Sequence, residues 1–406
     1  MKFWIKIVAG LFLGIIVGSY IGPESFSFEA LKVIGSFFMN LFSLAVLPLL
    51  VFSCIRSIIS LKLNKRLFLV LVKSLGYFVA LTAVGAAVGL IMGDVLKPGI
   101  GVDIKEIASP SVFYYPTTSE FLLRIMPGSV DEFLKSGYSV LAVLFISYLL
   151  ASGIILSRDD ADQFHSLIIS VEKTIHRLNL IVLEFLPIGI FAYIGYTMGS
   201  LNAAKVMPFL RLIFVVIAAA FVQVFVVQAL FVFFKTKLNP FKFLLTVIPS
   251  GIMAYVSGHR YTAYPVLIES MEHNLGADRE LTTFVTGLGT AFSMSGTALA
   301  TGVCTLFVAQ AYGLSLSVYL QIIIVLILTF ATFKMDGLKE GTIVLLTMLL
   351  GQVVKLPDEG YALLVGGTII IDQIAAVVDV TGNATISYVV AHSEEAVQNV
   401  NMKDFL

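Results

Sequence analysis

Long apolar segments follow one another along the chain and fix its class of fold. They lie near 4–21, 32–60, 67–96, 139–156, 179–200 and 206–234. Each can cross a bilayer, because about 20 helical residues span the hydrocarbon. Of the 406 residues, 58% are hydrophobic and only 13% are charged, too few charges for the surface of a soluble protein of this length. The sequence therefore predicts an all-α polytopic membrane protein.

The basic residues of the loops predict the orientation of these segments. Lysine and arginine lie before the first segment and after the second, fourth and sixth, whereas the 22–31 loop carries only Glu24 and Glu29. The N-terminus is therefore predicted to be cytoplasmic, in a multi-pass protein of the cytoplasmic (inner) membrane. The first segment is similar to a signal peptide, but no small-residue cleavage site follows it, which favours a retained helix.

The pattern changes after residue 240, where apolar stretches are interrupted by polar and glycine-containing breaks. A hairpin with a polar tip, followed by a helix with a polar face, occurs twice: 241–276 with 281–312, and 315–355 with 358–393. Irregular backbone at bilayer depth is tolerated where it lines a cavity or is buried in protein. Two such units in corresponding positions are typical of a transporter binding site.

The last apolar segment carries Asp372, Asp379 and Asn383. Offsets of seven and four residues place all three on one helical face. A carboxylate at this depth is costly and marks a candidate site for a solute or a cation. The alternative is a structural ion pair inside the helix bundle, because a buried charge needs a partner in any case.

Several motifs, taken together, resemble those of glutamate transporter homologues in the dicarboxylate/amino acid:cation symporter family. The resemblance runs from about residue 6 to 394, and the chain is similar to a divergent member. It implies eight transmembrane helices, two re-entrant helical hairpins, a homotrimer and an elevator mechanism. The motifs are Pro98-Gly99-Ile100-Gly101, Leu186-Pro187-Ile188-Gly189-Ile190-Phe191-Ala192, Ser295-Gly296-Thr297-Ala298, Gly302-Val303-Cys304-Thr305 and Val380-Thr381-Gly382-Asn383.

The same resemblance implies a division of the chain into a fixed scaffold and a mobile transport domain. The scaffold comprises 1–66 (helices 1 and 2) and 139–204 (helices 4 and 5). The transport domain comprises helix 3 at 67–97 and a core at 205–395. An external loop at 98–138 and a cytoplasmic tail at 396–406 complete the division.

The final helix departs from the family motif at the residues that would bind substrate. Asp372 matches the aspartate that holds a substrate amino group, but the arginine and threonine that follow are replaced by Ala375 and Ala376. The asparagine and the last aspartate are exchanged, as Asp379 and Asn383. The expected substrate-binding residues are Asp372, Asp379, Asn383, Arg260, Thr297 and Ala376.

The helix-seven motif departs at the residues that would bind sodium. Ser293 and Ser295 stand where the family has an asparagine and an aspartate, so the buried sodium site built on that aspartate is expected to be absent. The coupling ion is expected to be Na⁺ or H⁺, or coupling is altered, and no other cofactor is implied. The expected ion-coupling residues are Gly289, Ser293, Ser295, Asp379, Asn383 and Lys334.

The predicted hairpin tips carry basic side chains that could take over the roles of the missing family residues. Arg260 could present its planar fork to a substrate carboxylate, or instead pair with Asp379 or face water. Lys334 and Lys339 could stand in for a coupling cation, or pair at the exposed tip with Asp336 and Glu340. His259 could carry protons, although a simple hydrogen bond is favoured.

The sequence thus predicts a secondary active symporter for a small amino acid or a dicarboxylate. Its partners are that solute, membrane lipid and further copies of the chain; the net charge of zero gives no nucleic-acid footprint. No catalytic constellation is found, so an enzyme is not predicted. The alternative is an uncoupled channel or a sensor with the same fold. Cys54 and Cys304 are expected to be buried thiols.

Overall fold

The computed structural model describes residues 3–21, 25–63, 65–102, 140–200, 209–335, 347, 350–351, 353–354, 364 and 368–398. Throughout this part the regular structure is helical, apart from one antiparallel bridge between Ala277 and Val397. Seven of its helices are long and apolar enough to cross a membrane, or eight if a bent pair counts as one span. The prediction of an all-α polytopic protein is confirmed.

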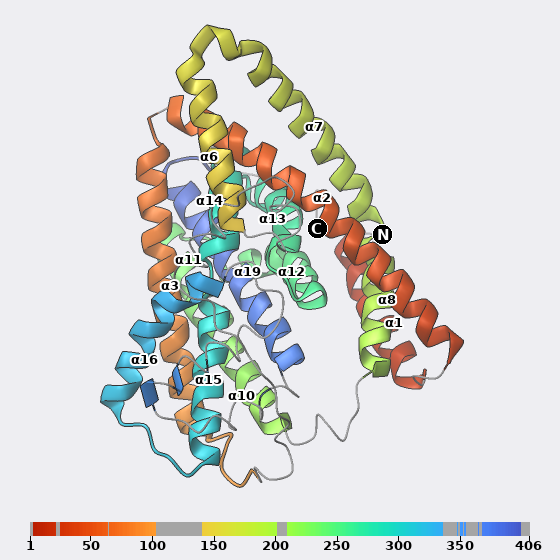
Figure 1. Cartoon of the computed structure of the whole chain (residues 1–406), viewed down its shortest axis with the longest axis vertical. Coiled ribbons are helices and arrows are strands. Elements are labelled where there is room, and N and C mark those ends of the chain that lie inside the picture. Colours follow the sequence, from red (N-terminus) through yellow and green to blue (C-terminus); the bar gives the residue numbers. More distant parts are fainter. Residues whose placement is uncertain are drawn as a thin grey trace.

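One group of helices is built around the long helix α2 (Phe26–Leu63), and we call it the α2 group (Figure 1). Its other members are α1 (Phe3–Tyr20), α6 (Val140–Ser157), α7 (Asp162–Glu184) and α8 (Leu186–Ser200). Glycines allow α1 and α8 to pack closely: a Cβ on Gly10 would lie 2.6 Å from the carbonyl oxygen of Pro187. Small residues at such crossings favour helix association in a membrane.

A second group surrounds α15 (Ser295–Ala311), and we call it the α15 group. In it, α3 (Leu67–Leu96) lies directly on α15, since a Cβ on Gly85 or Gly89 would come within 2.3 Å and 2.1 Å of carbonyl oxygens of α15. Its other members include α10 (Leu210–Phe221), the π-helix η4 (Val222–Gln228), α11 (Ala229–Thr236), α14 (Arg279–Phe292), α16 (Val318–Ala331) and α19 (Thr368–Ser393).

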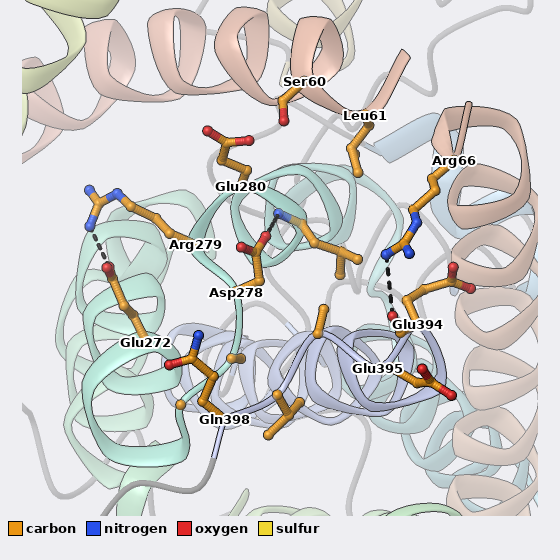
Figure 2. A pocket seen from close by; sticks show the side chains of 15 residues that line it. Ser60, Leu61, Arg66, Glu272, Asp278, Arg279, Glu280, Glu394, Glu395 and Gln398 are labelled. Atoms are coloured by element: carbon orange, nitrogen blue, oxygen red, sulfur yellow. Dashed lines mark hydrogen bonds and ion pairs between the residues drawn. The ribbon is translucent and has the colours of Figure 1, made fainter. Parts of the chain in front are cut away.

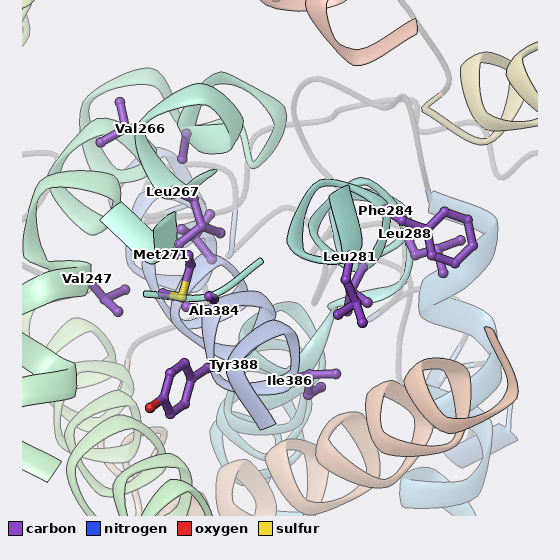
Figure 3. Close-up of a cluster of buried hydrophobic side chains, with 14 of the residues drawn as sticks. Val247, Val266, Leu267, Met271, Leu281, Phe284, Leu288, Ala384, Ile386 and Tyr388 are labelled. Carbon is purple, nitrogen blue, oxygen red and sulfur yellow. The ribbon is translucent and has the colours of Figure 1, made fainter. Parts of the chain in front are cut away.

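The first predicted hairpin is present in the α15 group. Its arms are α12 (Pro240–Ser257) and the run of η5 (Tyr261–Ala263), α13 (Tyr264–Glu269) and η6 (Ser270–Asn274). Gly258, with φ of +67°, ends the first arm in a left-handed conformation that glycine adopts without strain. Side chains of both arms, α14 and α19 form one apolar core, seen at Val247, Met271 and Tyr388 (Figure 3).

The first arm of the second hairpin, α16 followed by η7 (Thr332–Met335), is described as continuous helix, whereas only separate residues at 347, 350–351 and 353–354 are described in the rest of that hairpin. The predicted roles of Lys339, Asp336 and Glu340 fall on residues outside the described ranges, as do residues 103–138 of the predicted external loop 98–138. The side chain of Lys334 is likewise outside the described part. Cys54 and Cys304 are buried free thiols, as predicted.

The sequence prediction is wrong for the segment between the fourth and fifth predicted spans, which it treats as a loop. This segment forms the helix α7, whose buried positions include Ile168, Glu172 and Val182, while the basic residues Lys173 and Arg177 that suggested a loop are exposed. Helix α7 meets α8 at a bend of 52°. The bend lies just before Pro187, which lacks the N–H that would continue the helical hydrogen bonding. The second span also begins earlier than predicted, at Phe26.

Candidate solute and ion site

The polar break predicted in helix seven separates α14 from α15. Ser293 has an extended conformation, and α15 begins after Met294, which makes no side-chain cap. The first N–H groups of such a helix need acceptors from elsewhere. The break is deep inside the protein, since Ser293, Met294 and Ser295 are each at most 2% exposed. The acceptors must therefore come from a neighbouring helix.

Asp379 of α19 supplies them. Its Oδ1 accepts hydrogen bonds from the backbone N–H of Gly296 at 2.6 Å and of Thr297 at 3.3 Å, and its Oδ2 accepts one from the Thr297 hydroxyl at 2.7 Å. A carboxylate at a helix N-terminus is also favoured by the helix dipole. Gly296 permits this approach, because a Cβ there would lie 2.2 Å from the carbonyl oxygen of Ala375.

Arg260, from the tip of the first hairpin, reaches the same carboxylate. Its Nη1 lies 3.6 Å from Asp379 Oδ2 and 2.7 Å from the sulfur of Met294. The side chain of Arg260 is 18% exposed, whereas that of Asp379 is 1% exposed. The structure therefore contains the ion pair with Asp379, one of the contacts that the sequence allowed for Arg260. The longer distance makes it an ion pair without a hydrogen bond.

Asn383 lies one turn further along α19 and joins it to α14. Its Nδ2 donates to the carbonyl oxygen of Thr286 at 2.9 Å, and its Oδ1 accepts from Ser387 at 3.3 Å. Gly289 lies against the amide, and a Cβ there would be 1.9 Å from Oδ1. The structure thus brings Gly289 and Asn383 together.

The two serines of the helix break differ in their surroundings. Ser293 donates its hydroxyl to the carbonyl oxygen of Asp379 at 2.7 Å. The Ser295 hydroxyl is buried and has no hydrogen-bond partner among the described residues. Leaving a buried hydroxyl unsatisfied costs about 1–3 kcal/mol. Ser295 is therefore a place where a bound polar species would be stabilised.

Asp372 is not part of the hydrogen-bond set around Asp379. It lies seven residues earlier on α19 and is half-buried, and Ala376, between them, is 5% exposed. The structure therefore gathers Asp379, Arg260, Thr297, Ser293 and the Asn383–Gly289 pair around the break. It places Asp372 nearly two turns away along the same helix.

Sequence reasoning missed two glutamines of the π-helix η4. Gln223 and Gln228 are fully buried, and Gln228 donates to the carbonyl oxygen of Val378 at 3.2 Å. Both amide atoms of Gln223 and Oε1 of Gln228 have no partner within the described residues. π-Helical segments inserted in α-helices are frequent at functional sites. The available signal was a pair of amides inside an otherwise apolar run.

A polar pocket of about 580 Å³ lies at the base of the first hairpin, away from this set (Figure 2). Its wall includes the segment that follows α19, which is held by backbone hydrogen bonds from Asp278 to Ala396 and from Gln398 to Gly276, both 2.8 Å. Arg66 donates to the carbonyl oxygen of Glu394 at 3.3 Å. The pocket therefore joins the α2–α3 connection to the segment that follows α19.

Comparison with known proteins places these features in context. The family model of the sodium:dicarboxylate symporter family matches residues 3–393. The proton/sodium-glutamate symport protein of Geobacillus stearothermophilus is 27% identical over 404 residues, 96% of this chain and 94% of the relative. The proton/glutamate-aspartate symporter of Escherichia coli K12 is 27% identical, covering 96% and 92%. The C4-dicarboxylate transport protein of Bacillus subtilis is 25% identical, covering 96% and 93%.

Proposed function

The chain belongs to the sodium:dicarboxylate symporter family, and from this we propose that it is a secondary active symporter for a small amino acid or dicarboxylate. The family consists of transporters and not of enzymes. The relatives are named for glutamate, aspartate or C4-dicarboxylates, all of which carry carboxylates. The observation that carries the proposal is the guanidinium of Arg260, held by a hairpin tip beside the break between α14 and α15.

Arg260 is the proposed carboxylate-binding residue. A guanidinium has five N–H donors, and the two contacts described for Arg260 both use Nη1. The ion pair with Asp379 would orient the fork and leave further donors for an anionic solute. Thr297 and Asn383 would line the same site. In an amino acid, the ammonium group would go to Asp372.

Ion coupling is proposed to be altered. The Asp379 carboxylate is already neutralised by Arg260 and by the α15 N-terminus, so it does not need a bound cation. The hydroxyls of Ser293 and Ser295 are weaker ligands than a carboxylate. We therefore infer weak dependence on Na⁺, with H⁺ or the ammonium of Lys334 as the replacement charge.

The two helix groups would be the two parts of an elevator. The α2 group is the proposed scaffold and trimer contact, and the α15 group is the proposed mobile part that carries the site. The N-terminus would be cytoplasmic. Because Asp379 can be fully satisfied without an ion, an uncoupled channel or a sensor is the second candidate.

Uptake by purified protein in proteoliposomes separates these candidates. Labelled glutamate, aspartate and succinate would be offered with an imposed Na⁺ gradient, an imposed pH gradient, or neither. Accumulation above the external concentration under a gradient is expected for a symporter. Equilibration to the external concentration alone would indicate a channel. Solute binding without any uptake would indicate a sensor.

A further inference from the structure

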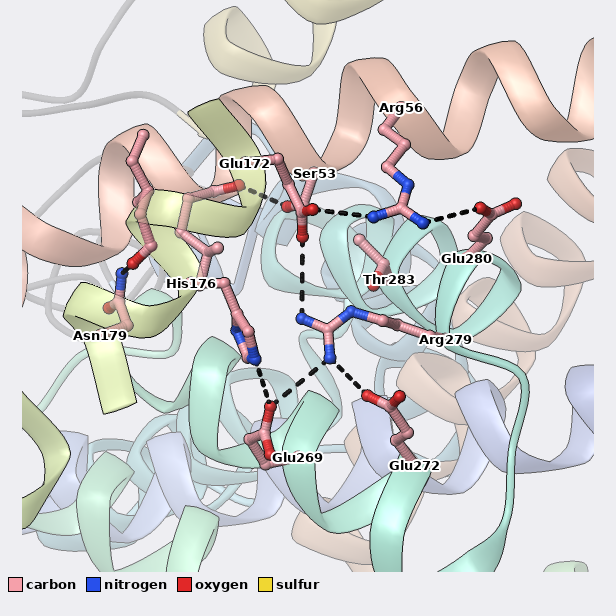
Figure 4. A network of polar contacts seen from close by, with 12 residues as sticks. Ser53, Arg56, Glu172, His176, Asn179, Glu269, Glu272, Arg279, Glu280 and Thr283 are labelled. Carbon is pink, nitrogen blue, oxygen red and sulfur yellow. Dashed lines mark hydrogen bonds and ion pairs between the residues drawn. The ribbon is translucent and has the colours of Figure 1, made fainter. Parts of the chain in front are cut away.

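A network of charged side chains joins the two helix groups near the pocket of Figure 2, on the side predicted to be cytoplasmic (Figure 4). The α2 group contributes Arg56 from α2 and Glu172 and His176 from α7. The α15 group contributes Glu269 from α13, Glu272 and His273 from η6, and Arg279 and Glu280 from α14. Of these groups, Glu269 contacts His176 directly, and Glu172 lies one turn before His176 on α7.

Three contacts of this network cross from one group to the other. His176 Nε2 lies 3.0 Å from Glu269 Oε1, Arg56 Nη2 lies 3.2 Å from Glu280, and Arg279 Nη2 lies 3.7 Å from Glu172. The remaining contacts stay within one group, such as that between Arg56 and Glu172 at 2.8 Å. Relative movement of the groups must break the three crossing contacts.

The network carries more negative than positive charge. Its two arginines face four glutamates, so its formal charge is −2 while both histidines are neutral. Glu172 is only 3% exposed, and Glu269 is 19% exposed, so water compensates this excess poorly. Added protons are the simplest neutralising species, and imidazole is the side chain that ordinarily changes charge between pH 5 and 8.

Glu269 is the acceptor around which both histidines gather. His273 Nε2 lies 3.0 Å from Oε2 of Glu269, and His176 lies 3.0 Å from Oε1. Burial alone would raise the pKa of Glu269, but the hydrogen bond from His176 and the nearby cations outweigh it and lower the pKa. Glu269 therefore stays ionised when the histidines take up protons.

We propose that His176 and Glu269 form a cytoplasmic proton-binding site that holds the two helix groups together when His176 is protonated. This proposal rests on the proposed function, in which the α15 group moves relative to the α2 group. It adds a site that regulates this movement. With His176 protonated the crossing contact is an ion pair, and the α15 group is held against α7. With His176 neutral it is a hydrogen bond without net charge, and the groups separate more readily.

Two substitutions of His176 set the charge of the site. In His176→Gln the side chain is neutral at every pH, and in His176→Arg it is positive at every pH. His165→Gln is the matched control, because His165 lies on the same helix α7 and is half-buried. The first readout is the unfolding temperature in detergent at pH of about 6 and about 8. The second is uptake into proteoliposomes whose internal pH is set to the same two values.

We expect uptake by the unmodified chain and by His165→Gln to be about two- to fivefold slower at the lower pH, the range of a partly exposed ion pair. At each pH the unfolding temperature is compared with that of His176→Gln. For the unmodified chain and for His165→Gln, this difference should be larger at the lower pH. Neither His176 variant should show this pH dependence, and His176→Arg should stay in the slow, stable state. A pH dependence of His176→Gln equal to that of the unmodified chain would overturn the proposal.

The two proposals fail in different ways. If no solute is taken up by any variant but the unfolding temperatures follow the expected pattern, the transport function is wrong and the proton-binding site stands. If uptake is concentrative but the His176 variants match the unmodified chain at both pH values, the site is wrong and the transport function stands. Should His176→Arg fail to fold, Glu269→Gln replaces it and is expected to behave as His176→Gln.

Discussion

Asp379 on α19 accepts a hydrogen bond from the backbone N–H of Gly296 at 2.6 Å and thereby closes the N-terminus of α15, a separate helix. The broken span would otherwise expose unpaired N–H groups inside the protein. The carboxylate is thus a structural element before any solute binds. Arg260, 3.6 Å away, ties the tip of the first hairpin to the same point.

Removing this carboxylate should destabilise the protein. In Asp379→Ala the N–H groups of Gly296 and Thr297 lose their acceptor and Arg260 loses its counter-charge, so we expect a loss of about 3–5 kcal/mol in the free energy of unfolding. Asp379→Asn keeps one acceptor oxygen and should lose less. Denaturation in detergent micelles measures both. An unchanged unfolding curve for Asp379→Ala would show that the cap contributes nothing.

Arg260→Ala should abolish binding of anionic solutes, because it removes the only guanidinium found beside the helix break among the described residues. Thermal-shift titration with glutamate, aspartate and succinate measures this, since a ligand of the folded state raises the unfolding temperature. Arg211→Ala is the control, because Arg211 is a helix-end arginine that contacts the carbonyl oxygen of Ile100. Unchanged uptake of an anionic solute by Arg260→Ala would reject this role.

Gly289→Ala should disturb the packing of α14 against α19 and lower the free energy of unfolding. The new Cβ would lie 1.9 Å from Oδ1 of Asn383, so either the amide or the helix must move, at a cost of about 1–3 kcal/mol. Gly76→Ala, on α3, is the matched control because no atom lies within 4 Å of its Cβ position. It should be neutral or slightly stabilising. Equal stability of the two variants would contradict the packing described here.

Sodium should have little effect on uptake by the unmodified chain, because hydroxyls replace the strong ligands at Ser293 and Ser295. Ser295→Asp places a carboxylate at a fully buried position, where it needs a cation. We expect sodium to stabilise this variant more than the unmodified chain, as a rise in unfolding temperature with Na⁺ that choline does not reproduce. Uptake by the unmodified chain that collapses without sodium would contradict the first expectation.

Acid should weaken the contacts of Glu269. Its pKa is lowered in the folded chain, so its contribution to stability is present above the ordinary glutamate pKa and is lost as the pH falls through the folded value. The loss of unfolding temperature between about pH 5 and pH 3 should be smaller in Glu269→Gln. Glu29→Gln, at an exposed position of α2, should keep the acid sensitivity of the unmodified chain.

Much of the fold could be predicted from the sequence because hydropathy is a local property. The apolar runs gave α3 and α6 within a residue, and Gly258 marked the turn of the first hairpin. Helix α7 was missed because an amphipathic helix can have the charge content of a loop. Its buried stripe, which includes Ile168 and Val182, becomes visible only against α2.

The sequence by itself determined that a buried acidic helix and a polar helix break exist, because a carboxylate in an apolar run is costly wherever the run is placed. Only the tertiary structure decided what the acids do. In the folded chain Asp379 accepts hydrogen bonds from N–H groups of α15 and pairs with Arg260, and Asp372 lies outside that set. His176 contacts Glu269 across the two helix groups. Such pairings depend on how helices distant in sequence pack, and no local pattern encodes the distance between two side chains.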